Sequence, residues 1–199
     1  MSRVELLAGS RAELLAERID EAIGVLELLR SPPVAEAVDR IAGAVVGALR
    51  GGGRVLLCGN GGSAADAQHL AAELVGRFQL ERQPFAAIAL GDNVAAVTAI
   101  GNDYSYDEVF SRAVLAHGRP GDVLIGLSTS GRSANVVRAL EAGRSRGLVT
   151  CAFVGAPGSP MAAAADLVVA VDGPGTARIQ EAHKLLGHTI FEIAERELC

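Results

Sequence analysis

The sequence predicts an α/β protein: a three-layer sandwich in which helices cover both faces of a five-stranded parallel sheet, preceded by two N-terminal helices. From residue 54 onwards, five short apolar runs alternate with helical segments. Alternation of this kind implies parallel strands joined by right-handed crossovers. The runs are almost unbroken, as in "VLIGL" and "LVVAV", which is typical of strands buried on both faces.

Two helical stretches come first. Val4 to Leu29 carries apolar residues at helical spacing, and Val34 to Leu49 follows the Ser31-Pro32-Pro33 punctuation. "GGG" at 51–53 ends the second stretch. A parallel α/β sheet does not require helices before its first strand, so residues 1–50 are expected to be an N-terminal helical extension. Its apolar surface either packs on the sheet or pairs with another subunit, in which case an isologous contact is expected.

The remaining elements follow in order. We expect strands near 54–58, 86–90, 122–127, 149–154 and 167–171, and helices near 63–77, 107–117, 133–146 and 179–197. The Ala-rich run 162–165 is expected to be a helical turn. No repeat or linker divides the chain, so residues 1–199 are expected to form a single domain.

Composition disfavours several classes of protein. A net charge of −5, without a Lys/Arg-rich run, argues against a nucleic-acid or acidic-membrane partner. Cys58, Cys151 and Cys199 form no CxxC pair, so neither a disulfide framework nor a thiolate zinc site is expected. There is no signal-like apolar region and no run of 18 apolar residues, so we expect a soluble, cytoplasmic protein.

Two turns have the composition of anion sites. "CGNGGSAADAQHLAAEL", from Cys58 to Leu74, combines a strand end, a glycine-rich turn and a helix; "LSTSGRSAN", from Leu127 to Asn135, follows another strand. Backbone N–H groups and the dipole at a helix N-terminus favour an anion. The second turn suits a single phosphate, through the hydroxyls of Ser128, Thr129, Ser130 and Ser133 beside Gly131. The alternative is that these residues merely cap the helix, although one cap needs only one hydroxyl.

A dinucleotide site is a competing interpretation of the first turn. "GNGGSA" formally satisfies GxGxxA, and Asp92 could supply the acid after the next strand. Against it, the turn follows two helices, and the second anion turn has no place in that interpretation. Both turns lie at strand carboxyl ends, where ligands of open α/β sheets bind.

Ionisable side chains suggest a proton-handling or metal site. His69 and Glu73 are four residues apart and share one helical face; the alternative is an exposed pair in weak contact. In the last helix, Gln180 and His188 are about 12 Å apart along the axis, so both could reach one ion only if it lay between them. His183 is interpreted as a core residue or as a group that supports a ligand.

With these motifs, the sequence resembles the bacterial phosphoheptose (sedoheptulose 7-phosphate) isomerases, a branch of the sugar isomerase (SIS) domain proteins. The matching segments are "CGNGGSAADAQHLAAELVGRF", "GNDY", "GDVLIGLSTSGRSANV" and "RIQEAHKLLGH". The resemblance implies a homotetramer with active sites between subunits, residues 1–50 contributing to assembly. It implies a sugar-phosphate substrate contacted by Asn60, Gly61, Gly62, Ser63, Glu73, Asn102, Asp103, Ser128, Thr129, Ser130, Ser133 and Gln180. One Zn²⁺ per subunit would be held by His69, Glu73, Gln180 and His188.

The implied reaction converts sedoheptulose 7-phosphate to D-glycero-D-manno-heptose 7-phosphate through an enediol. We expect Glu73 to shuttle the carbon proton, His188 to act as the partner acid/base, and zinc to polarise the carbonyl. Ala177 departs from relatives that have Asp before "RIQE", so any orienting role of that Asp is lost or supplied elsewhere.

Two other functions compete with the isomerase. A non-catalytic SIS-domain protein that binds a partner such as a replication initiator would not need Glu73 or His188. A sugar-phosphate-sensing regulator would need a DNA-binding module, for which 199 residues leave little room.

Overall fold

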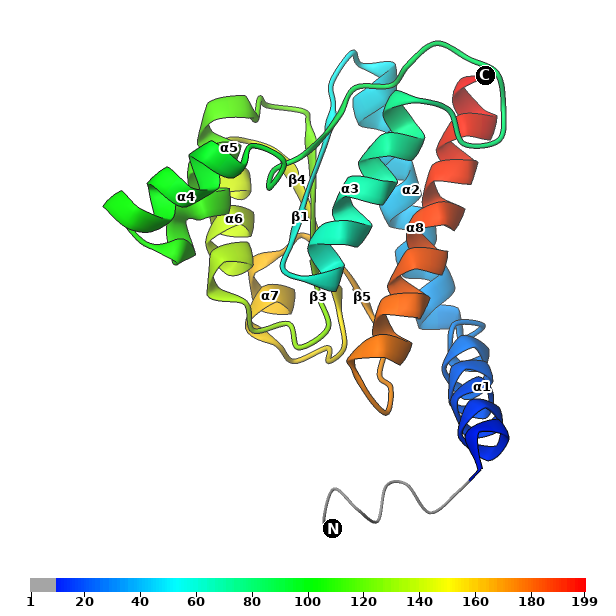
Figure 1. Cartoon of the computed structure of the whole chain (residues 1–199). Coiled ribbons are helices and arrows are strands. Elements are labelled where there is room, and N and C mark those ends of the chain that lie inside the picture. The colour runs from blue at the N-terminus through cyan, green and yellow to red at the C-terminus, as the bar shows by residue number, and fades with distance from the viewer. Residues whose placement is uncertain (1–9) are drawn as a thin grey trace.

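The computed structural model describes residues 10–199, and its elements confirm the α/β prediction (Figure 1). The strands are β1 (Val55–Gly59), β2 (Ala87–Ala89), β3 (Val123–Ser128), β4 (Val149–Val154) and β5 (Leu167–Ala170). The helices are α1 (Arg11–Leu28), α2 (Pro32–Arg50), α3 (Gly62–Val75), α4 (Val94–Asp103), α5 (Val109–His117), α6 (Ala134–Ser145), α7 (Pro160–Ala164) and α8 (Thr176–Leu198), with a 3₁₀ turn η2 (Tyr106–Glu108).

The sheet is parallel throughout, in the order β2-β1-β3-β4-β5. The chain passes from β1 outwards to β2 and then returns to place β3 on the other side of β1. The strand order therefore reverses between β1 and β3, and ligands of open α/β sheets bind outside the carboxyl ends of the strands at such a point. The two predicted anion turns follow these two strands.

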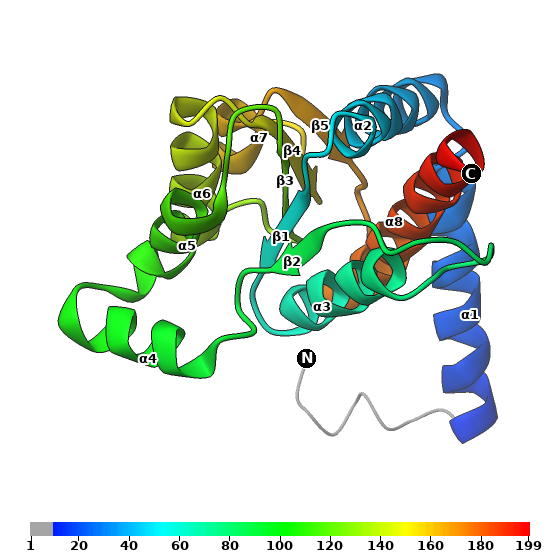
Figure 2. The same ribbon diagram turned by 90° about the horizontal axis from the view of Figure 1, so that it is seen from above.

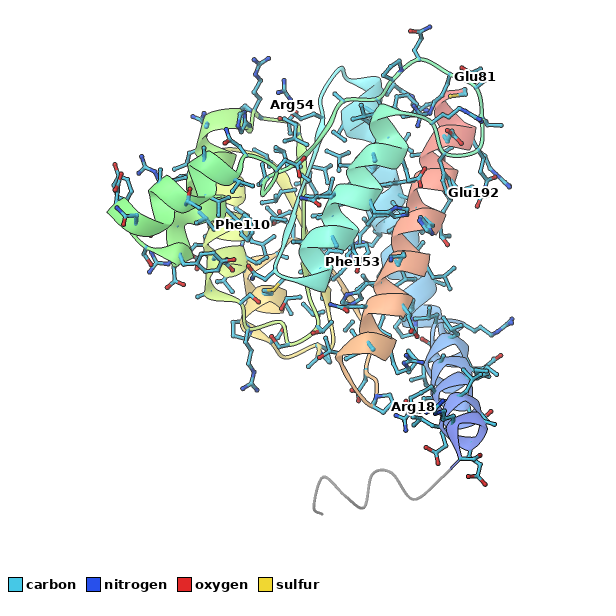
Figure 3. The ribbon with its side chains drawn as sticks, in the orientation of Figure 1. Arg18, Arg54, Glu81, Phe110, Phe153 and Glu192 are labelled. Carbon is cyan, nitrogen blue, oxygen red and sulfur yellow. The ribbon has the colours of Figure 1, made fainter. Side chains whose placement is uncertain are left out.

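Each face of the sheet is covered by its own helices and has its own apolar core (Figure 2). On one face, side chains of α2, α3 and α8 pack around Phe153 of β4; on the other, α5, α6 and α7 pack with Phe110 (Figure 3). Alternate strand residues serve the two faces, as with Leu56 and Leu57, because successive side chains point to opposite sides. The three-layer prediction is confirmed.

The N-terminal helices begin with clear capping signals. Ser10 and Glu13 form a reciprocal capping box at the start of α1. Pro32 occupies the first position of α2, where a missing N–H costs nothing. The part of the predicted first helix that includes Val4 and Leu7 lies outside the described residues.

The prediction was wrong for residues 94–103, where no helix was expected. α4 forms there, and Asn93 caps it by accepting a hydrogen bond from the Ala96 amide at 3.0 Å. α4 has no fully buried residue, and its apolar residues lie all around the helix, so no single face stands out in the sequence. In the part of the chain described, no helix is long and apolar enough to cross a membrane.

Candidate active site

The turn between β1 and α3 depends on glycines at close contacts. Gly61 has φ +55°, a conformation that favours glycine, and it precedes the first residue of α3. A Cβ on Gly59 would lie 2.7 Å from the Ser63 carbonyl oxygen. A Cβ on Gly62 would lie 2.5 Å from Nε2 of Gln180, so the side chain of Gln180 rests directly on this turn.

Reciprocal amide hydrogen bonds join the two anion turns. Asn60 and Asn135 each donate from Nδ2 to the other's Oδ1 at 2.9 Å, and the Tyr106 hydroxyl donates to Asn60 Oδ1 at 3.0 Å. Asn135 is buried, so this pair forms an ordered link between the turns that follow β1 and β3. A cavity of about 120 Å³ opens beside it and is lined by Asn60, Gln68 and Tyr106 among others.

The turn after β3 gathers hydroxyl groups at the start of α6. The Oγ atom of Ser128 lies 3.0 Å from that of Ser133 and 3.3 Å from that of Ser130. Ser133 is the N-cap residue of α6, yet its side chain makes no capping hydrogen bond. Capping by Ser133 therefore does not account for the hydroxyl cluster, and the arrangement fits a site for several phosphate oxygens.

Of the predicted proton and metal groups, His69, Glu73 and His188 converge between α3 and α8, which lie side by side in both views (Figures 1 and 2). Nε2 of His69 lies 2.8 Å from Nε2 of His188 and 3.6 Å from Oε1 of Glu73. Gly187 allows this approach, because a Cβ there would lie 2.7 Å from Cδ1 of Leu70 on α3. The contact between α3 and α8 therefore brings His188 to His69 and Glu73, although it lies at least 115 residues further along the chain.

The surroundings of His188 lower its pKa. Burial lowers its pKa, and the neighbouring His69 ring lowers it further, while Glu73 opposes the shift. A neutral imidazole can serve as a base or as a metal ligand at neutral pH. At 2.8 Å, the contact between the two rings is a hydrogen bond in which one nitrogen carries the proton.

The cluster has the donor atoms of a zinc site. One donor atom from each of His69, Glu73 and His188 lies within 4.8 Å of the others. Bonds of about 2.0–2.2 Å in a tetrahedral site place ligand atoms about 3.3 Å apart. The separations of 2.8 and 3.6 Å bracket that value, so these residues fit a divalent ion after small side-chain movements.

Two groups of predicted residues lie apart from this cluster. Gln180 contacts Gly62, about two helical turns before His188 along α8. Asn102 and Asp103 hydrogen-bond to each other at 2.8 Å on the exposed last turn of α4. α4 packs on the α5–α6 face of the sheet, opposite α3 and α8, so one chain does not bring this pair to the cluster.

His183 lies beneath the site in the core. Its side chain is 1% exposed and meets Phe153 edge-on, with ring centroids 5.8 Å apart. Neither ring nitrogen has a hydrogen-bond partner within residues 10–199. Burial lowers the pKa of His183 to about 4, which the nearby Val154 backbone and Asp66 carboxylate oppose only in part.

Comparison with known proteins identifies the family. The SIS domain family matches residues 20–155. A phosphoheptose isomerase from Rhodospirillum rubrum is 52% identical over 169 residues, which are 85% of this chain and 88% of the relative. The chain belongs to the phosphoheptose isomerase family. Another member, from Bradyrhizobium sp., is 48% identical over 96% of this chain and 91% of its own length.

Solved structures of the phosphoheptose isomerase family share the fold. The protein from Neisseria gonorrhoeae superposes with a TM-score of 0.87 at 42% identity, covering 94% of this chain and 100% of that chain. The protein from Francisella tularensis superposes with a TM-score of 0.88 at 33% identity over the same shares.

Sequence reasoning missed several residues that shape the site. Asn135 and Tyr106 were not predicted to brace Asn60, and nothing in their spacing indicated it. Asp66 of α3 is also missing from the prediction; it pairs with Lys184 of α8 at 3.0 Å between the glycine turn and the histidines. Its position three residues before His69 was the one available signal.

Proposed function

We propose that this chain converts sedoheptulose 7-phosphate to D-glycero-D-manno-heptose 7-phosphate, an aldose–ketose isomerisation. The observation that carries the proposal is the convergence of His69, Glu73 and His188 in a chain about half identical to named phosphoheptose isomerases. The same residues have no role in a non-catalytic partner-binding protein, so that alternative is not favoured.

The substrate phosphate would bind at the turn after β3. Ser128, Thr129, Ser130 and Ser133 offer hydroxyl donors there, and the N-terminus of α6 offers backbone N–H groups. The turn after β1, with Asn60, Gly61, Gly62 and Ser63, and the side chain of Gln180 would hold the sugar hydroxyls.

The chemical step moves one proton between adjacent carbons of the sugar. Glu73 would remove a proton from C1 of the ketose and return it to C2, while His188 would exchange protons with the two oxygens. The enediol forms and collapses without any net change in atoms or electrons. The lowered pKa of His188 leaves it neutral, so it can accept a proton before it donates one.

A zinc ion, one per subunit, would be held by His69, Glu73 and His188, with Gln180 as the further ligand that the resemblance implies. When bound, such an ion supplies Lewis-acid polarisation of a carbonyl oxygen. A carboxylate that also binds the ion is a weaker base, so Glu73 would have to loosen from the metal during turnover.

The protein would act in the cytoplasm as a homotetramer. Assembly of the subunits would complete the active site. α1 projects from the body (Figure 1) and exposes Leu15, Ile19 and Ile23. A hollow of about 400 Å³ beside them is lined by Leu26, Leu29 and Leu185 among others. Apolar surface of this extent suits a subunit contact. A neighbouring subunit could then supply Asn102 and Asp103, which lie apart from the cluster within one chain.

The direct test is conversion of sedoheptulose 7-phosphate by the purified protein, first after chelation and then with added Zn²⁺. We expect turnover to be lost on chelation and restored by the metal. Turnover that chelation does not change would remove zinc from the proposal; absence of turnover with zinc present would remove the reaction.

A further inference from the structure

We propose that Glu195 and Arg82 are positioning residues for the isomerisation. They fix the loop after α3 so that Phe78 packs against His188, and they anchor the end of α3 that carries Glu73. The proposal rests on the proposed function, which gives His188 and Glu73 their roles. The charged group of Arg82 contacts Glu73 only at its backbone carbonyl oxygen, and the carboxylate of Glu195 binds backbone amides of the loop and Arg82.

Glu195 fixes three consecutive backbone amides with one carboxylate. Oε1 accepts from the Phe78 amide at 3.1 Å; Oε2 accepts from the Gln79 amide at 2.7 Å and the Leu80 amide at 2.8 Å. The side chain is 1% exposed. Burial alone would raise the pKa of Glu195, but these amides and Arg82 together lower it, so the carboxylate stays charged.

Arg82 ties the same loop to α3. Its Nε atom donates to Oε1 of Glu195 at 2.8 Å, and its terminal nitrogens donate to the carbonyl oxygens of Glu73 at 2.8 Å and Leu74 at 2.9 Å. The guanidinium is 4% exposed and lies 4.1 Å from the Phe85 ring centroid. Carbonyl groups in the last turn of a helix lack partners within the helix, so Arg82 closes the end of α3 just behind Glu73.

We call the hydrogen-bonded pair of Glu195 and Arg82 the clamp. The clamp is connected to the candidate site through Phe78. The Phe78 ring stacks on the His188 ring with centroids 5.3 Å apart and planes at 21°. The His69 ring meets the His188 ring edge-on, with centroids 5.1 Å apart. His188 is therefore in contact with both the Phe78 and His69 rings. The backbone N–H of Phe78 in turn donates a hydrogen bond to Oε1 of Glu195, two helical turns beyond His188 along α8.

Stability alone does not explain the charged pair. Two buried charges lose their hydration, and apolar residues of similar volume often fill such a position at no loss of stability. The pair does what apolar residues cannot do: it binds three amides and two helix-end carbonyls in one fixed geometry. The residues that this pair positions are Glu73 and His188, to which the proposed mechanism assigns proton transfer.

The test compares Glu195→Gln with Asp122→Asn. Asp122 is a matched buried carboxylate, 2% exposed, which accepts from the Arg54 amide at 3.0 Å and the Arg119 amide at 2.9 Å beside the start of β3, away from the site. For both variants we would measure the melting temperature, kcat and KM on sedoheptulose 7-phosphate, and the Zn²⁺ affinity by competition with a chromogenic chelator.

We expect both variants to melt at lower temperature, and only Glu195→Gln to lose kcat and Zn²⁺ affinity, by about 10- to 100-fold, as for residues that orient metal ligands. KM should change little. Equal losses of kcat and affinity in Asp122→Asn, or none in Glu195→Gln, would overturn the proposal.

Phe78→Leu provides a second route if Glu195→Gln does not fold, because it leaves the clamp intact and removes the ring. We expect it to lower kcat and to move the His188 ring-proton signals in NMR spectra; an unchanged kcat and unchanged signals would overturn the proposal. The NMR signals and the Zn²⁺ affinity need no turnover. If the wild-type protein does not isomerise the sugar, the function fails while these readouts still test the clamp.

Discussion

Gly187 of α8 is in direct contact with Leu70 of α3, and this contact places His188 2.8 Å from His69. The close approach of the two helices is therefore a condition for the candidate site. Leu70 is 1% exposed and belongs to the apolar core on this face of the sheet, so a Cβ on Gly187 would require a buried side chain to shift.

Gly187→Ala tests this condition. Overpacking costs about 1–3 kcal/mol, which exceeds the gain of up to about 1 kcal/mol from the better helix former. We expect a lower free energy of unfolding in urea and a reduced kcat. Gly43→Ala on α2 is the control, since a Cβ there meets nothing within 4 Å; it should be neutral or stabilising and fully active. Full activity of Gly187→Ala would show that the site does not need the close contact.

Glu73→Gln tests the proton shuttle. Positioned acid–base groups contribute about 10²–10⁴-fold to rate, so we expect kcat to fall by that factor. The circular dichroism spectrum and the oligomeric state should stay as in the wild type. Glu81→Gln, at a side chain that is 90% exposed, should leave kcat unchanged. Near-normal turnover by Glu73→Gln would remove Glu73 from the mechanism.

His183 should make the fold sensitive to acid. Its pKa is lowered to about 4 from 6.5, so the unfolded chain binds this proton more readily than the folded chain. The contribution of His183 leaves the free energy of unfolding unchanged above about pH 6.5. As the pH falls from about 6.5 to about 4, protonation of the unfolded chain lowers the free energy of unfolding, by about 3 kcal/mol in total below pH 4. Urea unfolding of the chelated protein at pH 7 and pH 4.5 should show a smaller loss for His183→Leu than for the wild type. Equal losses would mean that His183 is not the group that senses acid.

The apolar face of α1 should control assembly. Ile19 and Ile23 are 49% and 52% exposed in the single chain. We expect Ile19→Glu combined with Ile23→Glu to dissociate the assembly and lower activity, because charges would be buried in a subunit contact. Light scattering gives the mass of the particle. Glu17→Gln on the same helix should keep both assembly and activity, and a monomeric wild-type protein would contradict the prediction from the start.

The sequence was sufficient for the five strands, because each is a short, mainly apolar run; β1, β3 and most of β4 are buried, whereas the edge strands β2 and β5 are largely half-buried. It was insufficient for α4, because the apolar residues of this helix lie all around it and no single face stands out in the sequence. His69 and Glu73 could be paired from their helical spacing. The links from Glu195 to Phe78 and Arg82 span more than 110 residues and depend on how α8 packs, which no local pattern encodes.

The position of α8 in the chain has a consequence for folding. All five strands precede it, yet it supplies His188, Gln180 and Glu195. Its apolar side chains, including Phe191, also close one face of the sheet. Closing the hydrophobic interior and bringing together the candidate catalytic residues are therefore the same docking event, so a molecule whose interior is fully closed is also one in which these residues have met.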